Sequence, residues 1–186
     1  MIRSILLALL LSTGLMACSS APPAPVDRFY RLEATPINSS VLVGPVEVLP
    51  FQADSLYAER PLVFSVAGDT RQLQQYHYHL WLYPPKQLVR DHLTASLGLI
   101  SSPAGKGAAM TLEGRVLRLD RVISGKSGKA VVTLELRVKR GEKQVFSKTY
   151  EADQEAAGEG VSAHVLAVEQ ALGKVYADFL KDAAAR

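Results

Sequence analysis

Valine and leucine occupy every second position of residues 132–138, and polar or charged residues fill the positions between them. A period of two predicts a β-strand with one face on a core and the other face in water. Residues 110–123 and 144–150 are similar apolar-rich stretches, and glycine-containing turns separate the three. The pattern therefore predicts a three-stranded antiparallel meander in the C-terminal half.

The N-terminal half holds four more stretches that favour strands, because they alternate or are rich in β-branched residues. These are residues 28–34, 41–49, 62–66 and 72–78. Pro45 interrupts the second stretch and places it at an edge, a bulge or a strand start, since proline cannot donate a ladder hydrogen bond. The polar, glycine-containing segments 101–108 and 151–160 predict connections between elements.

Two stretches show the spacing of amphipathic helices. The first is predicted over residues 85–97, because Pro84-Pro85 suits a first helical turn and Gly98 suits the left-handed residue that follows a helix. The second is predicted over residues 162–181. Its apolar stripe consists of Val165, Val168, Leu172, Val175, Tyr176 and Phe179.

The order of these elements predicts an α+β fold, with a largely antiparallel β-sheet covered by two α-helices in a single domain. The predicted domain spans residues 27–186, a length that suits one core. No cysteine lies within it, so no internal disulfide can form. Its stability must come from the packing of that core.

The N-terminus has the layout of an export signal. Arg3 precedes the apolar run 5–11, which is too short to cross a bilayer, and small residues dominate the segment 12–17. Cys18, the only cysteine, follows at the position where a bacterial lipoprotein signal peptidase cuts. We therefore predict a signal peptide at 1–17 and lipid attachment at Cys18; the alternative is an ordinary secretory signal with a chance cysteine.

Residues 18–26 are small and proline-rich, which predicts a solvated tether between the lipid and the domain. Lipidated bacterial proteins with Asp directly after the cysteine tend to stay at the inner membrane. Here that sorting position is Ser19. Because serine and not aspartate follows the cysteine, the resemblance to this sorting pattern favours the periplasmic face of the outer membrane.

Composition and motifs argue against several function classes. A net charge of +3, without a basic stripe interleaved with aromatic residues, does not indicate nucleic-acid binding. Gly125-Lys126-Ser127 imitates the end of a phosphate-binding loop, but Asp120 stands where that loop requires glycine. His77 and His79 share one strand face but lack a third ligand. We predict no metal, no cofactor and no catalytic residue.

The densest feature of the domain is its aromatic segment, residues 76–85. It contains Tyr76, Tyr78, Tyr83 and the only tryptophan, Trp81. These rings could pack the core and the start of the helix, which is the favoured interpretation for Trp81. They could also form a partner-binding surface, since tyrosine and tryptophan supply large contact areas. For Tyr76 and Tyr78 the two interpretations have equal support, and all four residues are candidate partner-binding residues.

The aromatic segment also carries a family resemblance. The order Tyr76-x-x-x-x-Trp81, two residues, Pro84 and then a helix resembles the ABC-type transport auxiliary lipoproteins, which include the lipoprotein of paraquat-inducible (Pqi) systems. Leucines of that helix and short motifs elsewhere agree with the resemblance. They are Leu88, Leu93, Leu97, Phe29 to Leu32, Val46 to Pro50, Leu62-Val63, residues 132–138, Ala167 and Leu172.

This resemblance implies a role. It implies an outer-membrane lipoprotein that pairs with an MCE-domain protein and an inner-membrane ABC permease and helps to move lipids between the membranes. It also allows a ring-like homo-oligomer, and it implies no hydrolysis. The alternatives are a non-catalytic envelope-assembly lipoprotein, an activator of a cell-wall synthase, and a metal-dependent enzyme that uses His77 and His79.

Overall fold

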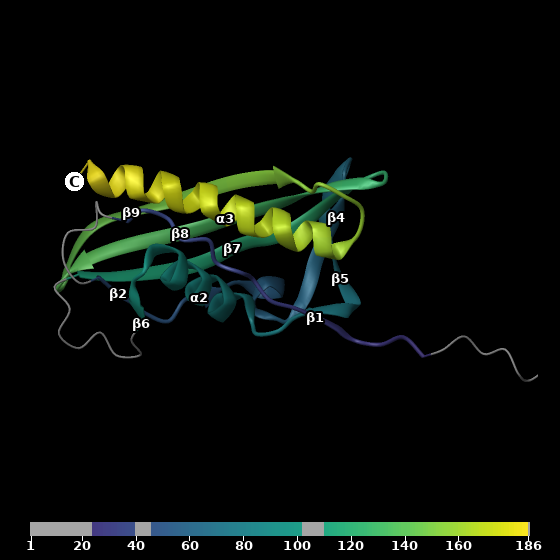
Figure 1. The fold of residues 1–186 in the computed structure, drawn as a ribbon, viewed down its shortest axis with the longest axis horizontal. Helices are drawn as coiled ribbons and strands as arrows, with labels where there is room; N and C mark the ends of the chain where they lie inside the picture. The colour runs from purple at the N-terminus through teal and green to yellow at the C-terminus, as the bar shows by residue number, and fades with distance from the viewer. Residues whose placement is uncertain (1–23, 40–45, 102–109, 186) are drawn as a thin grey trace, which may run out of the picture.

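A computed structural model describes residues 24–39, 46–101 and 110–185 (Figure 1). The predicted signal peptide, Cys18, Ser19 and most of the predicted loop 101–108 lie outside these residues. The described parts form nine β-strands of one sheet, two α-helices and a short 3-10 helix, η2 (Ser55–Ala58).

The sheet is organised around strand β7 (Met110–Ser124). Strand β8 (Ser127–Arg140) pairs with one side of β7 in an antiparallel ladder, and β9 (Lys143–Glu155) continues the meander. The other side of β7 pairs in parallel with three short strands in succession. These are β2 (Val46–Val48), β3 (Gln52–Ala53) and β4 (Pro61–Val66).

Three further strands complete the sheet. Strand β5 (Asp69–Trp81) pairs with β4 in an antiparallel ladder, and β1 (Arg28–Tyr30) pairs with β5 in parallel at that edge. Strand β6 (Ile100–Ser101) pairs in parallel with β2. The long ladders are therefore antiparallel, and short parallel ladders connect them into one mixed sheet.

The structure confirms the α+β class and the antiparallel meander. Several predicted bounds were wrong. The connection predicted at 151–160 is strand as far as Glu155, because that part of β9 keeps its ladder with β8. The strand predicted at 28–34 ends at Tyr30, and the one predicted at 72–78 runs from Asp69 to Trp81. Of the strand predicted at 41–49, residues 46–48 are strand and 41–45 lie outside the described residues.

Helix α2 (Pro85–Leu97) has the predicted bounds. Its first residue is proline, and Gly98 closes it in the left-handed conformation with φ 62°. Helix α3 (Val161–Ala184) follows the meander and is slightly longer than predicted. Figure 1 shows α3 running along β8 and β9, with α2 beside it over the other half of the sheet.

Both helices cover the same face of the sheet and share one core. The predicted apolar stripe of α3 is buried, and so are the alternating residues Leu134, Leu136 and Val138 of β8. The two helices meet where His92 Nδ1 of α2 lies 3.1 Å from the Tyr176 hydroxyl of α3. The opposite face of β8 carries Glu135 and Arg137 in its C-terminal half, so that half is apolar on one side and charged on the other, whereas Val131 on the same face is buried.

Candidate functional site

The four aromatic residues predicted to bind a partner fall into two groups. Trp81 is 1% exposed and belongs to the core, which agrees with the packing interpretation favoured for it. Tyr76 is half-buried, and its ring lies 4.5 Å from that of Phe64. Tyr78 and Tyr83 are 44% and 48% exposed. Of the four, only these last two residues are exposed to a partner in this structure.

Tyr76 takes part in a polar cluster between the strands. Its hydroxyl accepts a hydrogen bond of 3.1 Å from the Arg121 guanidinium, and its ring meets the ring of His79 edge-on. His79 Nδ1 in turn lies 2.7 Å from the Tyr30 hydroxyl. Partial burial, followed by the nearby charges of Arg28 and Arg121, lowers the pKa of His79. The cluster ties β1, β5 and β7 together.

The remaining histidines do not assemble a ligand set. His77 is exposed on β5, whereas His92 and His164 are buried beneath the two helices. Burial lowers the pKa of His92 to about 4 and that of His164 to about 3, so both imidazoles are neutral at neutral pH. Within residues 24–39, 46–101 and 110–185, no three His, Cys, Asp or Glu side chains are placed to hold a metal ion.

A groove opens where the parallel pairing along β7 is interrupted. Strand β2 pairs with residues 110–112 of β7 and β3 with Arg115 and Val116, while the chain between β2 and β3 bulges away. The resulting cavity has a volume of about 570 Å³. Its lining comes from three separate segments of the chain. The lining residues are Leu49, Pro50, Gln52, Ala53, Asp54, Glu113, Gly114, Arg115, Glu135 and Arg137.

Gly114 is essential to the shape of this groove. A side chain at this position would overlap the ring of Phe51, which is 3% exposed and packs against the β7 backbone on the core side. The close approach of Phe51 holds the bulging segment between β2 and β3 against the sheet. The absence of a side chain at Gly114 therefore fixes the wall of the groove.

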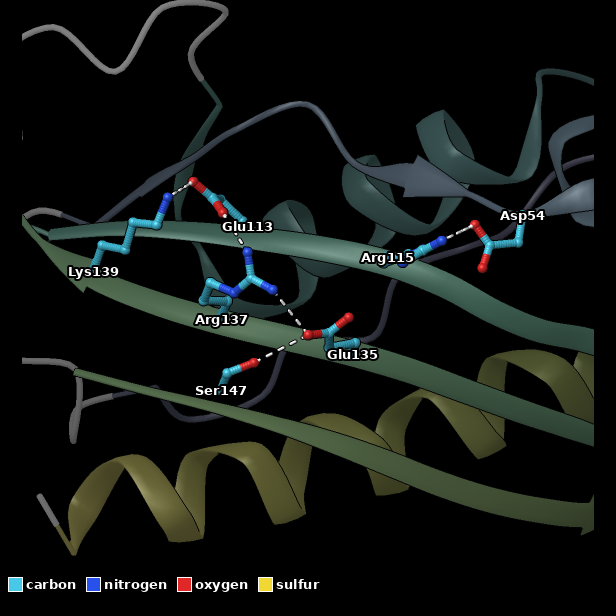
Figure 2. Close-up of polar contacts among 7 residues, drawn as sticks. All are labelled: Asp54, Glu113, Arg115, Glu135, Arg137, Lys139 and Ser147. Atoms are coloured by element: carbon cyan, nitrogen blue, oxygen red, sulfur yellow. Dashed lines mark hydrogen bonds and ion pairs between the residues drawn. The ribbon is translucent and has the colours of Figure 1, made fainter. Parts of the chain in front are cut away.

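Charged side chains form a row across the floor of the groove (Figure 2). Lys139 Nζ donates to Glu113 Oε1 at 2.6 Å, and the Arg137 guanidinium bridges from Glu113 at 3.6 Å to Glu135 at 3.0 Å. The Ser147 hydroxyl also donates to Glu135, at 3.1 Å. The row thus continues from β7 across β8 to β9.

A separate pair closes the end of the row nearest η2. Arg115 Nε donates to Asp54 Oδ1 at 2.8 Å, and both side chains are well exposed. With this pair, three basic and three acidic side chains line or flank the groove. Such exposed pairs add little to stability. Their balanced, alternating charges can instead select the register of a polar ligand or a partner segment.

Sequence reasoning did not find this groove. Its polar residues alternate with the core residues of β7 and β8 and therefore resemble an ordinary solvent-facing strand surface. The pairing of Glu113 with Arg137 and of Arg115 with Glu135 also depends on a register shift in β7 between Val116 and Arg118, which a period-two pattern does not reveal. The contribution of residues 49–54 depends on parallel pairing over a long sequence separation.

The domain has two layers and belongs to the α+β class, because both helices cover one face of the sheet and charged side chains lie on the other. The sequence profile of the ABC-type transport auxiliary lipoprotein component matches residues 31–179, and the chain belongs to this family. No curated protein matches the chain. No helix in the described parts combines the length and hydropathy that crossing a membrane requires.

Solved structures show the same fold at low sequence identity. A Xanthomonas campestris protein of the DUF330 family has a TM-score of 0.66 and 18% identity over 82% of this chain and 92% of its own. An uncharacterized protein has a TM-score of 0.67 and 16% identity over 84% and 98%. A hypothetical protein of Chlamydia trachomatis has a TM-score of 0.50 and 8% identity over 77% and 100%.

Proposed function

We propose that this lipoprotein is the outer-membrane docking component of an ABC-type lipid-transport system. In this role it sits on the periplasmic face of the outer membrane and binds an MCE-domain protein, which connects to an inner-membrane ABC permease. The observation that carries the proposal is the family match, which extends over residues 31–179 and thus over nearly the whole folded domain. The protein contributes binding and assembly, and it hydrolyses nothing.

Attachment to the membrane is proposed to occur through Cys18. Cleavage before this residue gives a new N-terminus that carries acyl chains, and Ser19 directs the product to the outer membrane. Several acyl chains on one residue provide the firm attachment that a single chain does not. The family name supports this step, since it describes a lipoprotein component.

The charged groove is the proposed docking surface for the MCE-domain protein. Its side chains are already held by neighbours of opposite charge, so a partner meets a preformed pattern and little ordering is needed on binding. A groove of about 570 Å³ accepts a short polar segment rather than a flat surface. Arg137 is central, because it contacts both Glu113 and Glu135.

Affinity purification of the full-length protein from detergent-solubilised envelopes tests this role. We expect an MCE-domain protein to co-purify. Recovery of cell-wall synthesis proteins in its place would support the alternative function as a synthase activator, and recovery of neither would contradict both proposals. The mass of the purified complex also tests whether copies of the chain associate.

A charge-reversed variant tests the docking surface separately from the role. Arg137→Glu should reduce the amount of partner recovered roughly tenfold or more. Reversing a charge within an interface typically removes at least one close pair of opposite charges between the two proteins. Lys129→Glu is the matched control, because Lys129 lies on the same face of β8 and pairs with Asp153 at the other end of the meander. Equal recovery with both variants would remove the groove from the docking surface and leave the role intact.

A further inference from the structure

Four large apolar side chains are exposed around the edge formed by β1 and β5. Phe29, Tyr78, Leu82 and Tyr83 are 51%, 44%, 40% and 48% exposed, and we call them the β1–β5 patch. In the parallel register Phe29 lies beside Leu80, and the Leu82 backbone N–H donates to the Tyr30 carbonyl just beyond the ladder. The patch is therefore continuous across the two strands.

The alternation of side chains along β5 explains why Phe29 and Leu82 face outward, whereas Tyr83 lies beyond the end of the strand. Trp81 points into the core, so its neighbours Leu80 and Leu82 point to the other side of the sheet, where Phe29 also lies. Tyr30 and His79 point inward and bond to each other. The exposure of Phe29 and Leu82 thus follows from the same pattern that buries Trp81.

An arginine accompanies the apolar side chains. The Arg60 guanidinium lies 5.1 Å from the centre of the Phe29 ring, and its Nε donates to the Trp81 carbonyl at 3.0 Å. Among the described residues, Arg60 forms no ion pair with a carboxylate. Its remaining N–H groups are free to bind an anionic oxygen. Arg28 is also exposed, but it lies beside His79 in the register and so starts on the other side of the sheet from Phe29.

The tether enters the domain inside this patch. Phe29 follows Cys18 by eleven residues, and such a segment reaches at most about 40 Å when fully extended. A lipid on Cys18 therefore holds the β1–β5 edge close to the bilayer. Because the tether makes contact with the lipid surface an intramolecular event, even a small patch can remain in contact with that surface.

We propose that the β1–β5 patch rests on the lipid surface of the membrane that holds the anchor. Tyrosine, phenylalanine and leucine would occupy the headgroup region, where amphipathic rings are favoured, and Arg60 would bind a lipid phosphate. The contact fixes which end of the domain faces the membrane. This inference rests on the proposed anchoring at Cys18.

Fluorescence of the full-length lipidated protein in vesicles of phosphatidylethanolamine and phosphatidylglycerol tests the proposal. Lipid attachment uses the only native thiol, so Phe29→Cys, Leu82→Cys and Tyr83→Cys each supply a single site for an environment-sensitive fluorophore. We expect a blue shift and quenching by acyl-chain doxyl lipids at all three sites. Val66→Cys is the matched control, because Val66 is 47% exposed at the opposite end of the β4–β5 hairpin. Its probe should remain in water.

Flotation of each labelled sample separates the possible failures. Protein that does not float with the vesicles would show that the anchor itself is absent. Floating protein whose patch probes stay in water, or whose Val66 probe is quenched equally, would overturn the proposal. A blue shift that disappears when the protein is diluted within the vesicles would assign the patch to contact with a second copy and overturn it as well.

Discussion

Gly114 shows how one missing side chain shapes this molecule. Phe51 fills the space above it, so we expect Gly114→Ala to force the ring or the β7 backbone aside and to lower the free energy of unfolding by roughly 1–3 kcal/mol. Urea unfolding measures the change. Gly173→Ala is the control, because nothing lies near that helical position, and it should raise the stability by about 0.5–1 kcal/mol. Equal effects of both variants would contradict this account.

The buried histidines predict a pH dependence of stability. His164 titrates at a pKa of about 3 in the folded protein and His92 at about 4, whereas an unfolded histidine titrates near 6.5. Below 6.5 the unfolded chain binds more protons than the folded one. As the pH falls from 6.5 to its folded pKa, each histidine therefore lowers the free energy of unfolding by about 1.4 kcal/mol per pH unit. Above pH 6.5 its contribution is constant.

Substitution checks that sign. His164→Gln and His92→Gln should each make the free energy of unfolding fall less steeply between pH 6.5 and 4.5, as measured by urea unfolding at several pH values. Each variant is compared with the unsubstituted protein, since Asp120 and Glu169, whose pKa values burial raises, titrate in both. A slope that neither buried substitution alters would show that these histidines do not cause the dependence.

The aromatic residues show how far a local pattern reaches. The burial of Trp81 was predicted, because a tryptophan before a helix start commonly packs against the sheet. The position of Tyr76 could not be predicted. The register of β5 shifts between the pairs Val63–Gln75 and Pro61–Leu80, so Tyr76 and His79, which have opposite parity, meet on one side. An irregularity of this kind is invisible in a period-two pattern.

At the scale of elements, the two faces of β8 should differ sharply in their contribution to stability. Leu134 is fully buried under α3, and Leu134→Ala should cost about 2–5 kcal/mol by opening a cavity. Its neighbour Glu135 forms exposed polar contacts, and Glu135→Ala should cost less than about 1 kcal/mol. Urea unfolding of both variants checks the contrast. Similar costs would mean that the charged row supports the fold as strongly as the core does.

The elements that the sequence predicts best are those whose signals are local. The bounds of α2 follow from Pro85 and Gly98, and the meander follows from alternation and glycine turns. The parallel ladders of β7 with β2, β3 and β4 were not predicted, because periodicity reports the face of a strand and not its neighbour. The groove was missed for the same reason, since it forms where two of these ladders are interrupted.

For the whole molecule, the anchor should be separable from the fold. Cys18 lies outside the predicted domain, so Cys18→Ala should leave the domain folded and abolish membrane retention. Fractionation of cells after export measures retention, and circular dichroism of the released protein measures folding. Ser19→Asp is a matched change at the sorting position, and it should move the lipidated protein to the inner membrane. Retention of Cys18→Ala in the outer membrane would contradict the proposed anchor.

The central position of β7 has a consequence for the order of folding. Strands β8 and β9 and helix α3 follow β7 directly, so their contacts close short loops, whereas β2 and β4 must wait for a strand that lies far downstream. A chain delivered N-terminus first therefore presents β2 and β4 before their shared partner β7 exists. We expect amides of β7, β8 and β9 to gain protection first in pulsed hydrogen exchange, and the parallel ladders of β2 and β4 with β7 to form later.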